Sequence, residues 1–204
     1  MDSENISRGA DLLVQRLTNA MAVDGAIYAE SVLCAMGCVA GYACQADVRS
    51  EYLLSGGNEE SAVFDIYSDK SGRHYYFGEL TDRLLIGEGL SLWGMVSRVS
   101  AGLPDINEIM KYVSSAAGSE KFGVVRNCTV GDDMFSYLKM LWQPMSELAI
   151  PYCEAGGLHV VFGAALAKLV KSLSAQGVDT KESVRIAMES AVSMSRVDIR
   201  ETWR

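Results

Sequence analysis

The chain has 204 residues, 49% of them hydrophobic and 22% charged, which is typical of one globular domain (1–204) with a sizeable core. Its net charge of −8 argues against a general binder of nucleic acid or of an anionic membrane surface, because both need a basic face. Five cysteines, an odd count without disulfide-like spacing, predict free thiols and a cytoplasmic location.

The first half of the chain begins with two predicted helices. Residues 3–22 carry an apolar stripe at helical spacing, and Asp24-Gly25 interrupts the pattern. Residues 30–54 follow as the helix around which we expect the other helices to pack. Because the connection is short, these two helices should form an antiparallel pair.

Two glycines give the second helix its predicted central place. Gly37 and Gly41 are four residues apart and therefore lie on one helix face. Each costs roughly 1 kcal/mol relative to alanine inside a helix, so a close crossing with another helix must offset the loss. Cys34, Cys38 and Cys44 are then expected to be small buried hydrophobes.

A membrane span is the alternative interpretation of residues 26–46, which are numerous enough to cross a bilayer. On an insertion scale the four strong aliphatics supply roughly −1 to −2.5 kcal/mol, whereas Glu30 near the middle costs about +2.5 to +3.5 kcal/mol. The acidic first 24 residues also differ from a basic secretory leader. We therefore expect no membrane association.

A β-hairpin is predicted next, with strands at 62–67 and 73–77 joined by a turn at 69–72. Residues 83–86 are a possible third strand. A two-stranded hairpin alone is marginal in water, so it must pack on helices, gain strands or pair with a second subunit.

The remaining elements are mostly helical. Helices are expected at 90–103, 104–117, 134–148 with a kink or break at Pro144, 158–173 and 180–194, with a mainly loop segment at 118–133 and a polar tail from residue 195 onward. The predicted fold class is therefore α+β and mainly α-helical, a bundle of roughly six to eight helices with one small antiparallel hairpin or three-stranded sheet.

The most polar and aromatic cluster lies on and after the second strand. It contains His74, Tyr76, Glu79, Asp82 and Arg83, the candidate catalytic or ligand-binding residues. Imidazole titrates near neutrality, so His74 is a candidate general base oriented by Glu79 or Asp82. The alternative is an ordinary half-buried hairpin, in which polar and aromatic residues also alternate.

The sequence contains no recognisable metal-binding or cofactor-binding motif, so we expect neither a metal nor a cofactor. Cys34 and Cys38 share a helix face, but Cys44 is off that stripe and no histidine is near in sequence. Gly87-Glu88-Gly89 lacks the third glycine and the Gly-Lys-Ser/Thr of a phosphate loop. His159 is interpreted as a partly buried structural histidine.

Several strings resemble a family of short uncharacterised bacterial proteins to which no activity is assigned. They are ESVLCAMGCVAGYACQADVR (30–49), HYYFGELTDRLL (74–85), LPDINEI (103–109), SEKFG (119–123) and MSRVDI (194–199). The resemblance implies one intact domain and carries over no catalytic residue.

Two functional hypotheses follow from the sequence. A hairpin that needs a partner, in a chain without a recognisable catalytic motif, favours a non-enzymatic cytoplasmic accessory or interaction protein that self-associates, with a homodimer as the simplest form. Its acidic surface would also suit a basic protein partner. The alternative is a small-molecule binder or enzyme with a site between residues 73–83 and the helices.

Overall fold

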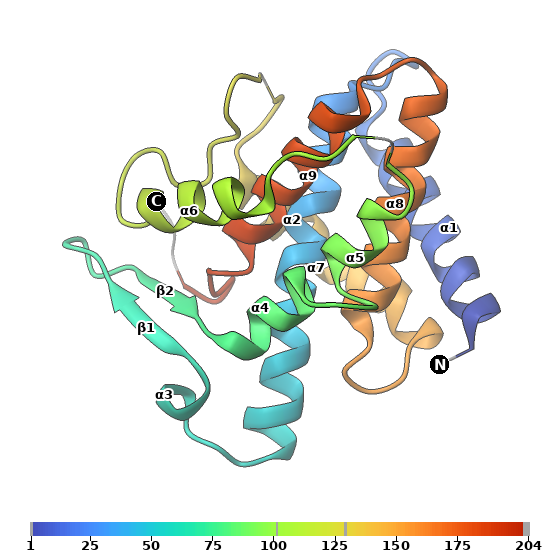
Figure 1. Cartoon of the computed structure of the whole chain (residues 1–204). Coiled ribbons are helices and arrows are strands. Elements are labelled where there is room, and N and C mark those ends of the chain that lie inside the picture. Colours follow the sequence, from blue (N-terminus) through green and yellow to red (C-terminus); the bar gives the residue numbers. More distant parts are fainter. Residues whose placement is uncertain (1, 101, 129, 202–204) are drawn as a thin grey trace.

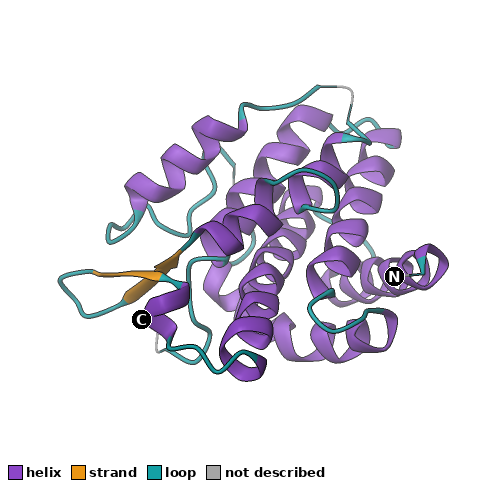
Figure 2. Cartoon of the chain, turned by 60° about the horizontal axis from the view of Figure 1, so that its bottom comes forward, coloured by secondary structure: helices purple, strands orange, loops and turns teal. Residues whose placement is uncertain are grey.

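A computed structural model describes residues 2–100, 102–128 and 130–201 of the chain (Figures 1 and 2). Helices dominate these residues, and one two-stranded antiparallel sheet accompanies them, which confirms the predicted fold class. The elements are α1 (Ser3–Met21), α2 (Ala29–Val48), the π-helical η1 (Arg49–Ser55), α3 (Glu60–Val63), β1 (Asp65–Ser68), β2 (His74–Phe77), α4 (Glu79–Ile86), α5 (Leu92–Ser97), α6 (Ile106–Ala116), α7 (Met134–Ala149), the short η2 (Ile150–Tyr152), α8 (Leu158–Ala175) and α9 (Thr180–Met194).

Helix α2 runs through the middle of the molecule, as predicted (Figure 1). Every residue from Ser31 to Gln45 is buried, and α7, α8 and α9 pack around this segment. The sequence explains this position because apolar and small residues cover the whole circumference of the helix, which is the pattern of a helix enclosed on all sides.

The crossing of α2 with α9 occurs at the two glycines. A Cβ atom added to Gly41 would lie 2.5 Å from the carbonyl carbon and 2.6 Å from the Cα atom of Ala191, and one added to Gly37 would lie 2.9 Å from the Cβ atom of Ser190. Real Cβ atoms essentially never come within 3.0 Å of a heavy atom to which they are not linked through neighbouring bonds. The predicted close approach is therefore confirmed, and dispersion between the two backbones offsets the cost of glycine.

Helix α1 does not form the expected pair with α2; it packs mainly on α8. Lys168 of α8 donates from Nζ to the backbone oxygen of Ser7 at 2.8 Å and reaches Asp11 of α1. The connection at residues 22–28, with a tight turn at Asp24-Gly25, is long enough to place α1 against α8. The surface of α2 is already covered by α7, α8 and α9, so α1 forms the outer layer.

Two helical segments, Ala29–Ser55 and Leu158–Ala175, are long and apolar enough to cross a membrane by length and composition alone. In this structure 94% of the apolar window in the first segment and 61% of that in the second are buried inside the molecule. Core helices of water-soluble proteins share this pattern.

Three local expectations are corrected. Residues 83–86 belong to α4 rather than to a third strand, since Thr81 and Leu85, four residues apart, both face the core. The helix expected at 90–103 is limited to α5, which the Ser91 hydroxyl caps. Helix α7 continues through Pro144 without the break that was one of the two expected outcomes: the carbonyl that proline leaves unbonded belongs to Met140, whose side chain is exposed, so water can reach that side of the helix.

Candidate functional site

The hairpin places one aromatic residue of β2 on each side of the sheet. Tyr75 pairs with Tyr67 in register and packs its ring edge-on against Phe122, with ring centroids 4.8 Å apart. Tyr76 faces the opposite side and meets Phe64 at 5.7 Å. Both tyrosines are buried, so β2 is covered on both faces and holds the hairpin to the helices.

The C-terminal tail covers the outer edge of β2. The backbone N–H of Tyr76 donates to the carbonyl oxygen of Arg196 at 2.8 Å, and the Gln45 amide donates to the carbonyl oxygen of Ser195 at 3.0 Å. Residues 195–198 are buried between α2 and β2, whereas the sequence indicated only a polar tail. The prediction missed this burial because the partners lie far away along the chain.

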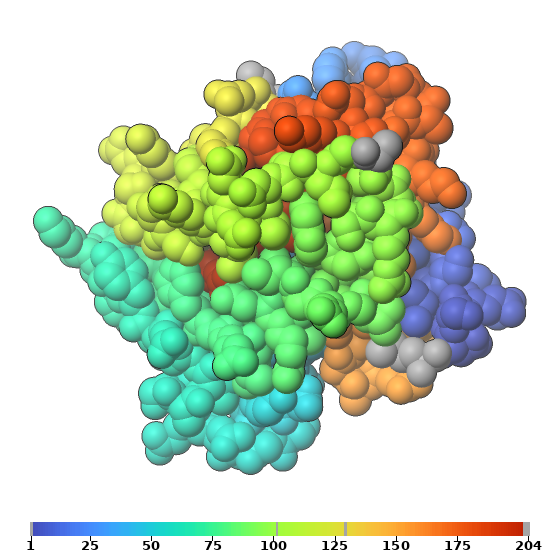
Figure 3. All heavy atoms as spheres, in the orientation of Figure 1, coloured from blue at the N-terminus to red at the C-terminus, as the bar shows by residue number. Residues whose placement is uncertain are grey.

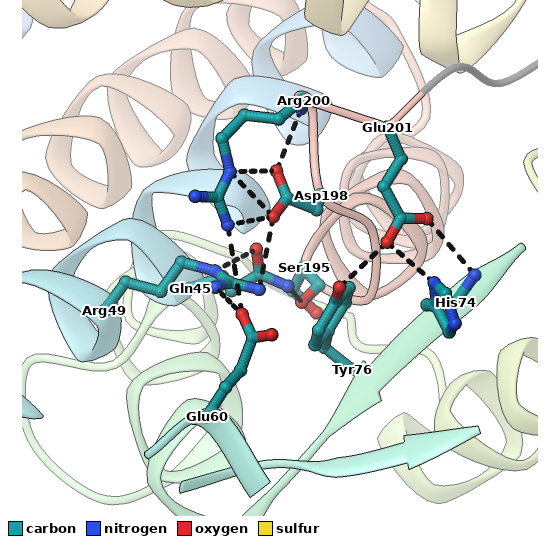
Figure 4. Close-up of polar contacts among 9 residues, drawn as sticks. All are labelled: Gln45, Arg49, Glu60, His74, Tyr76, Ser195, Asp198, Arg200 and Glu201. Atoms are coloured by element: carbon teal, nitrogen blue, oxygen red, sulfur yellow. Dashed lines mark hydrogen bonds and ion pairs between the residues drawn. The ribbon is translucent and has the colours of Figure 1, made fainter. Parts of the chain in front are cut away.

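Glu201 lies at the centre of a small polar group that includes two of the candidate residues (Figure 4). Its carboxylate is 3.0 Å from Nδ1 of His74, and it accepts hydrogen bonds from the Tyr76 hydroxyl at 2.8 Å and from the His74 backbone N–H at 3.2 Å. The acid beside His74 is therefore Glu201 rather than Glu79 or Asp82.

A second group surrounds Arg49 at the start of η1 (Figure 4). Its guanidinium carbon lies 4.6 Å from the ring centroid of Tyr76, and Nη2 lies 3.5 Å from a carboxylate oxygen of Asp198. Arg49 also pairs with Glu60, and Arg200 pairs with Asp198. The group ties α2, α3, the hairpin and the tail together through charge-assisted contacts.

The other three candidate residues lie apart from His74. Asp82 pairs with Arg196, whose side chain is only 1% exposed. Glu79 and Arg83 are exposed on α4. The structure thus brings His74 and Tyr76 together through Glu201, joins Asp82 to the tail separately, and leaves Glu79 and Arg83 at the surface.

The pKa values of Asp198 and Tyr76 in this region are shifted. Burial disfavours the charged form of Asp198, but hydrogen bonds from Arg200 and the charge of Arg49 outweigh it, so the pKa of Asp198 lies below its usual range. Burial, together with the hydrogen bond to Glu201, raises the pKa of Tyr76 well above 10. The Tyr76 hydroxyl therefore remains protonated and acts as a donor.

Buried polar residues elsewhere have structural partners. Asp47 of α2 accepts the backbone N–H of Leu158 at 3.2 Å and that of His159 at 2.8 Å, and it lies 2.7 Å from Nδ1 of His159. It therefore caps the start of α8 from another helix. His159 is buried, so it contributes to packing as well as to this cap.

The chemistry available at the hairpin is limited by its surroundings. A histidine beside a carboxylate can transfer protons, and Glu201 would orient the imidazole of His74 for that role. Four cavities, of about 760, 290, 270 and 200 Å³, are lined by described residues, and the five candidates line none of the four. Among the described residues, no group of three or more His, Cys, Asp or Glu side chains is placed to hold a metal ion.

Sequence reasoning missed Arg49, Asp198, Arg200 and Glu201. The only local signal is the segment from Arg196 to Glu201, in which basic and acidic residues are interspersed with Val197 and Ile199, a pattern equally typical of a solvated tail. No family model matches the chain, and comparison with characterised proteins and with solved structures also finds no match.

Proposed function

We propose that this chain is a non-enzymatic, cytoplasmic interaction protein that self-associates through the free edge of β1. One observation carries the proposal. All four residues of β1 are exposed, with Ile66 at 40% and Tyr67 at 51%, while the tail occupies the outer edge of β2. Figure 3 shows the tip of the hairpin projecting from the rest of the molecule, and the exposure of β1 leaves its edge accessible. Five free thiols suit the cytoplasm.

The register shows which backbone groups the β1 edge presents. His74 and Tyr76 direct their backbone N–H groups to the tail and thus away from β1. In an antiparallel pair the two residues opposite each other point their backbone groups the same way, either both inward or both outward. Ser68 and Ile66, the partners of His74 and Tyr76, therefore direct their N–H and C=O groups outward.

A second copy of this edge satisfies those groups symmetrically. With a two-fold axis at Tyr67, Ile66 of each copy pairs with Ser68 of the other, and two hairpins become a four-stranded sheet. The two Tyr67 rings then meet, extending the contact that Tyr67 makes with Tyr75 at 6.0 Å. Asp65 would face Asp69 of the second copy. Arg73 offsets the charge of Asp69 in each copy, because its Nε lies 2.9 Å from the Asp69 carboxylate.

Sedimentation equilibrium over about 1–500 µM tests the proposal, since this range brackets a micromolar dissociation constant. We expect a monomer–dimer equilibrium that Ile66→Lys abolishes, because a lysine on an edge strand blocks pairing. Ser68→Pro should do the same by removing one outward N–H while leaving the β1–β2 ladder intact.

Leu54→Lys is the matched control, because Leu54 is 84% exposed in η1, outside the hairpin. It should leave the dimer unchanged. A monomer at every concentration contradicts self-association, and a dimer that survives both hairpin substitutions contradicts the role of the β1 edge.

A further inference from the structure

The largest of the four cavities lies at the N-terminal end of α2, away from η1 at the other end of that helix. Its volume is about 760 Å³, within the range of about 300–1,000 Å³ that is typical of ligand sites. It is lined by Ala20, Met21, Val23, Ile27, Tyr28, Ala29, Glu30, Ser31, Val130, Gly131, Tyr137, Met140 and Val178. Figure 1 shows the end of α1, the start of α2 and the α8–α9 connection together at this end of the molecule.

The walls of this cavity are apolar and partly open to solvent. Val23 is 56% exposed, Ile27 47% and Met140 57%, although all three are hydrophobic. Leaving such residues in water costs free energy that an apolar ligand would recover. The two methionines, Met21 and Met140, have flexible side chains that can adapt to the shape of a ligand.

Two hydroxyl groups lie together at one part of the wall. The Ser31 hydroxyl accepts the backbone N–H of Gly131 at 2.9 Å. A Cβ atom on Gly131 would lie 3.3 Å from the Tyr137 hydroxyl and 3.4 Å from that of Ser31, so both are against this glycine. Ser31 and Tyr137 are buried, and they supply polar contact points within an otherwise apolar surface.

The charge of the lining favours a ligand with a positive charge. Glu30 is the only charged residue among the described residues that line the cavity, and it makes no ion pair with any described residue. Asp132 and Asp179 adjoin the lining residues Gly131 and Val178 in sequence, which makes the surroundings more acidic. Tyr28 offers an aromatic ring, and such rings attract cations.

We propose that this cavity binds an apolar molecule with a single positive charge, an amine or a quaternary ammonium. The apolar body contacts Met21, Ile27 and Met140, and the cationic head lies beside Glu30. An anionic amphiphile such as a fatty acid would find no basic partner there and would meet the carboxylate of Glu30. This site is independent of the β1 edge, so either proposal can fail without the other.

Three ligands with the same ten-carbon chain and different head groups test the assignment: decyltrimethylammonium, decanol and decanoate. Each is titrated calorimetrically into the 204-residue protein, the two ionic ligands below their critical micelle concentrations and decanol below its solubility limit, with circular dichroism to verify that the helices persist. We expect the cation to bind about fivefold tighter than decanol, as for one solvent-accessible charge pair, and decanoate to bind more weakly than decanol. Equal affinity for the three overturns the assignment, as does failure of the cation to bind.

Variants separate this site from general adsorption to an acidic protein. Glu30→Gln should weaken binding of the cation about fivefold and leave decanol unchanged, whereas Glu88→Gln, which alters an exposed acid elsewhere, should change neither. Ala20→Trp fills the cavity from an exposed position on α1 and should reduce binding of both ligands at least tenfold. Asn19→Trp, exposed on the same helix turn but outside the lining, is its control. Equal effects of the two glutamine variants, or of the two tryptophan variants, contradict the proposal.

Discussion

Gly41→Ala adds one methyl group at the crossing of α2 and α9, against the backbone of Ala191. Its Cβ atom would lie 2.5 Å from the carbonyl carbon of Ala191 and nearer still to the carbonyl oxygen. Ordinary van der Waals contact begins at about 3.4 Å, so clearing the carbonyl carbon alone requires α9 to withdraw by roughly 0.9 Å, and clearing the oxygen requires a larger movement. The obstacle is backbone, which cannot change rotamer, so the whole helix has to move.

Two costs and one gain set the size of this effect. Overpacking a well-packed core costs about 1–3 kcal/mol, and a rigid obstacle places Gly41→Ala at the upper end of that range. A gap of 0.5–1 Å also forfeits about a quarter to a half of the dispersion energy of each contact along the crossing. Replacing glycine by alanine in a helix recovers about 1 kcal/mol. The net expectation is a loss of about 2 kcal/mol.

Urea denaturation measures this loss. For a chain of this size the slope m is about 2–3 kcal/mol per M, so the midpoint should fall by roughly 0.7–1 M with m unchanged. Gly163→Ala in α8 is the matched control, because Gly163 is also buried but the added Cβ would meet the flexible ends of Met95 and Leu92. We expect a shift of less than half that size. If the two variants have equal midpoints, the contact with a rigid backbone does not set the cost.

Three further outcomes are expected. Asp198→Asn should flatten the loss of stability at acid pH. The folded-state pKa of Asp198 lies below its unfolded value near 3.9, so its stabilising contribution is complete above pH 3.9 and disappears as the pH falls through the folded-state pKa. Urea midpoints from pH 6 to 2.5 measure this, and they would show no flattening if the carboxylate were unpaired. In native protein only Cys128 and Cys153 should react with a thiol reagent. Both should react slowly, because burial raises the pKa of both thiols, that of Cys128 to about 11. All five cysteines should react in denaturant, and rapid labelling of more than two in the native protein would show that α2 is accessible. Asp47→Ala should lower the free energy of unfolding by about 2–4 kcal/mol, because it removes the cap of α8 and leaves His159 buried without its partner; an unchanged thermal midpoint would contradict the cap.

Much of the fold could be predicted because the deciding signals are local. Gly37 and Gly41 indicated a close helix crossing, which the structure confirms. The hairpin and its turn followed from β-branched and aromatic residues flanking Asp69 to Gly72, although β1 begins at Asp65, three residues later than predicted, because Glu60–Val63 form α3. Each of these signals involves residues within a few positions of one another, so the sequence alone is sufficient.

The features that the sequence did not reveal depend on distant partners. Residues 83–86 are apolar enough for a strand, and only the core contacts of Thr81 and Leu85 decide in favour of α4. At the candidate site, His74 and its acid Glu201 are 127 residues apart. The burial of Arg196 likewise depends on Asp82, 114 residues away. Local composition carries no trace of such pairings, so charged residues near the C-terminus read as solvated.

The chain order of the core has a consequence for synthesis. The central helix lies within the first 48 residues, but the helix against which its glycines pack begins at Thr180, and Gln45 bonds to Ser195, 150 residues later. During synthesis, α2 must therefore remain without α9 until residues 180–194 have emerged, and contacts of such long sequence separation form slowly. During that interval the face of α2 that carries Gly37 and Gly41 lacks its cover, which leaves part of an apolar helix open to chaperones.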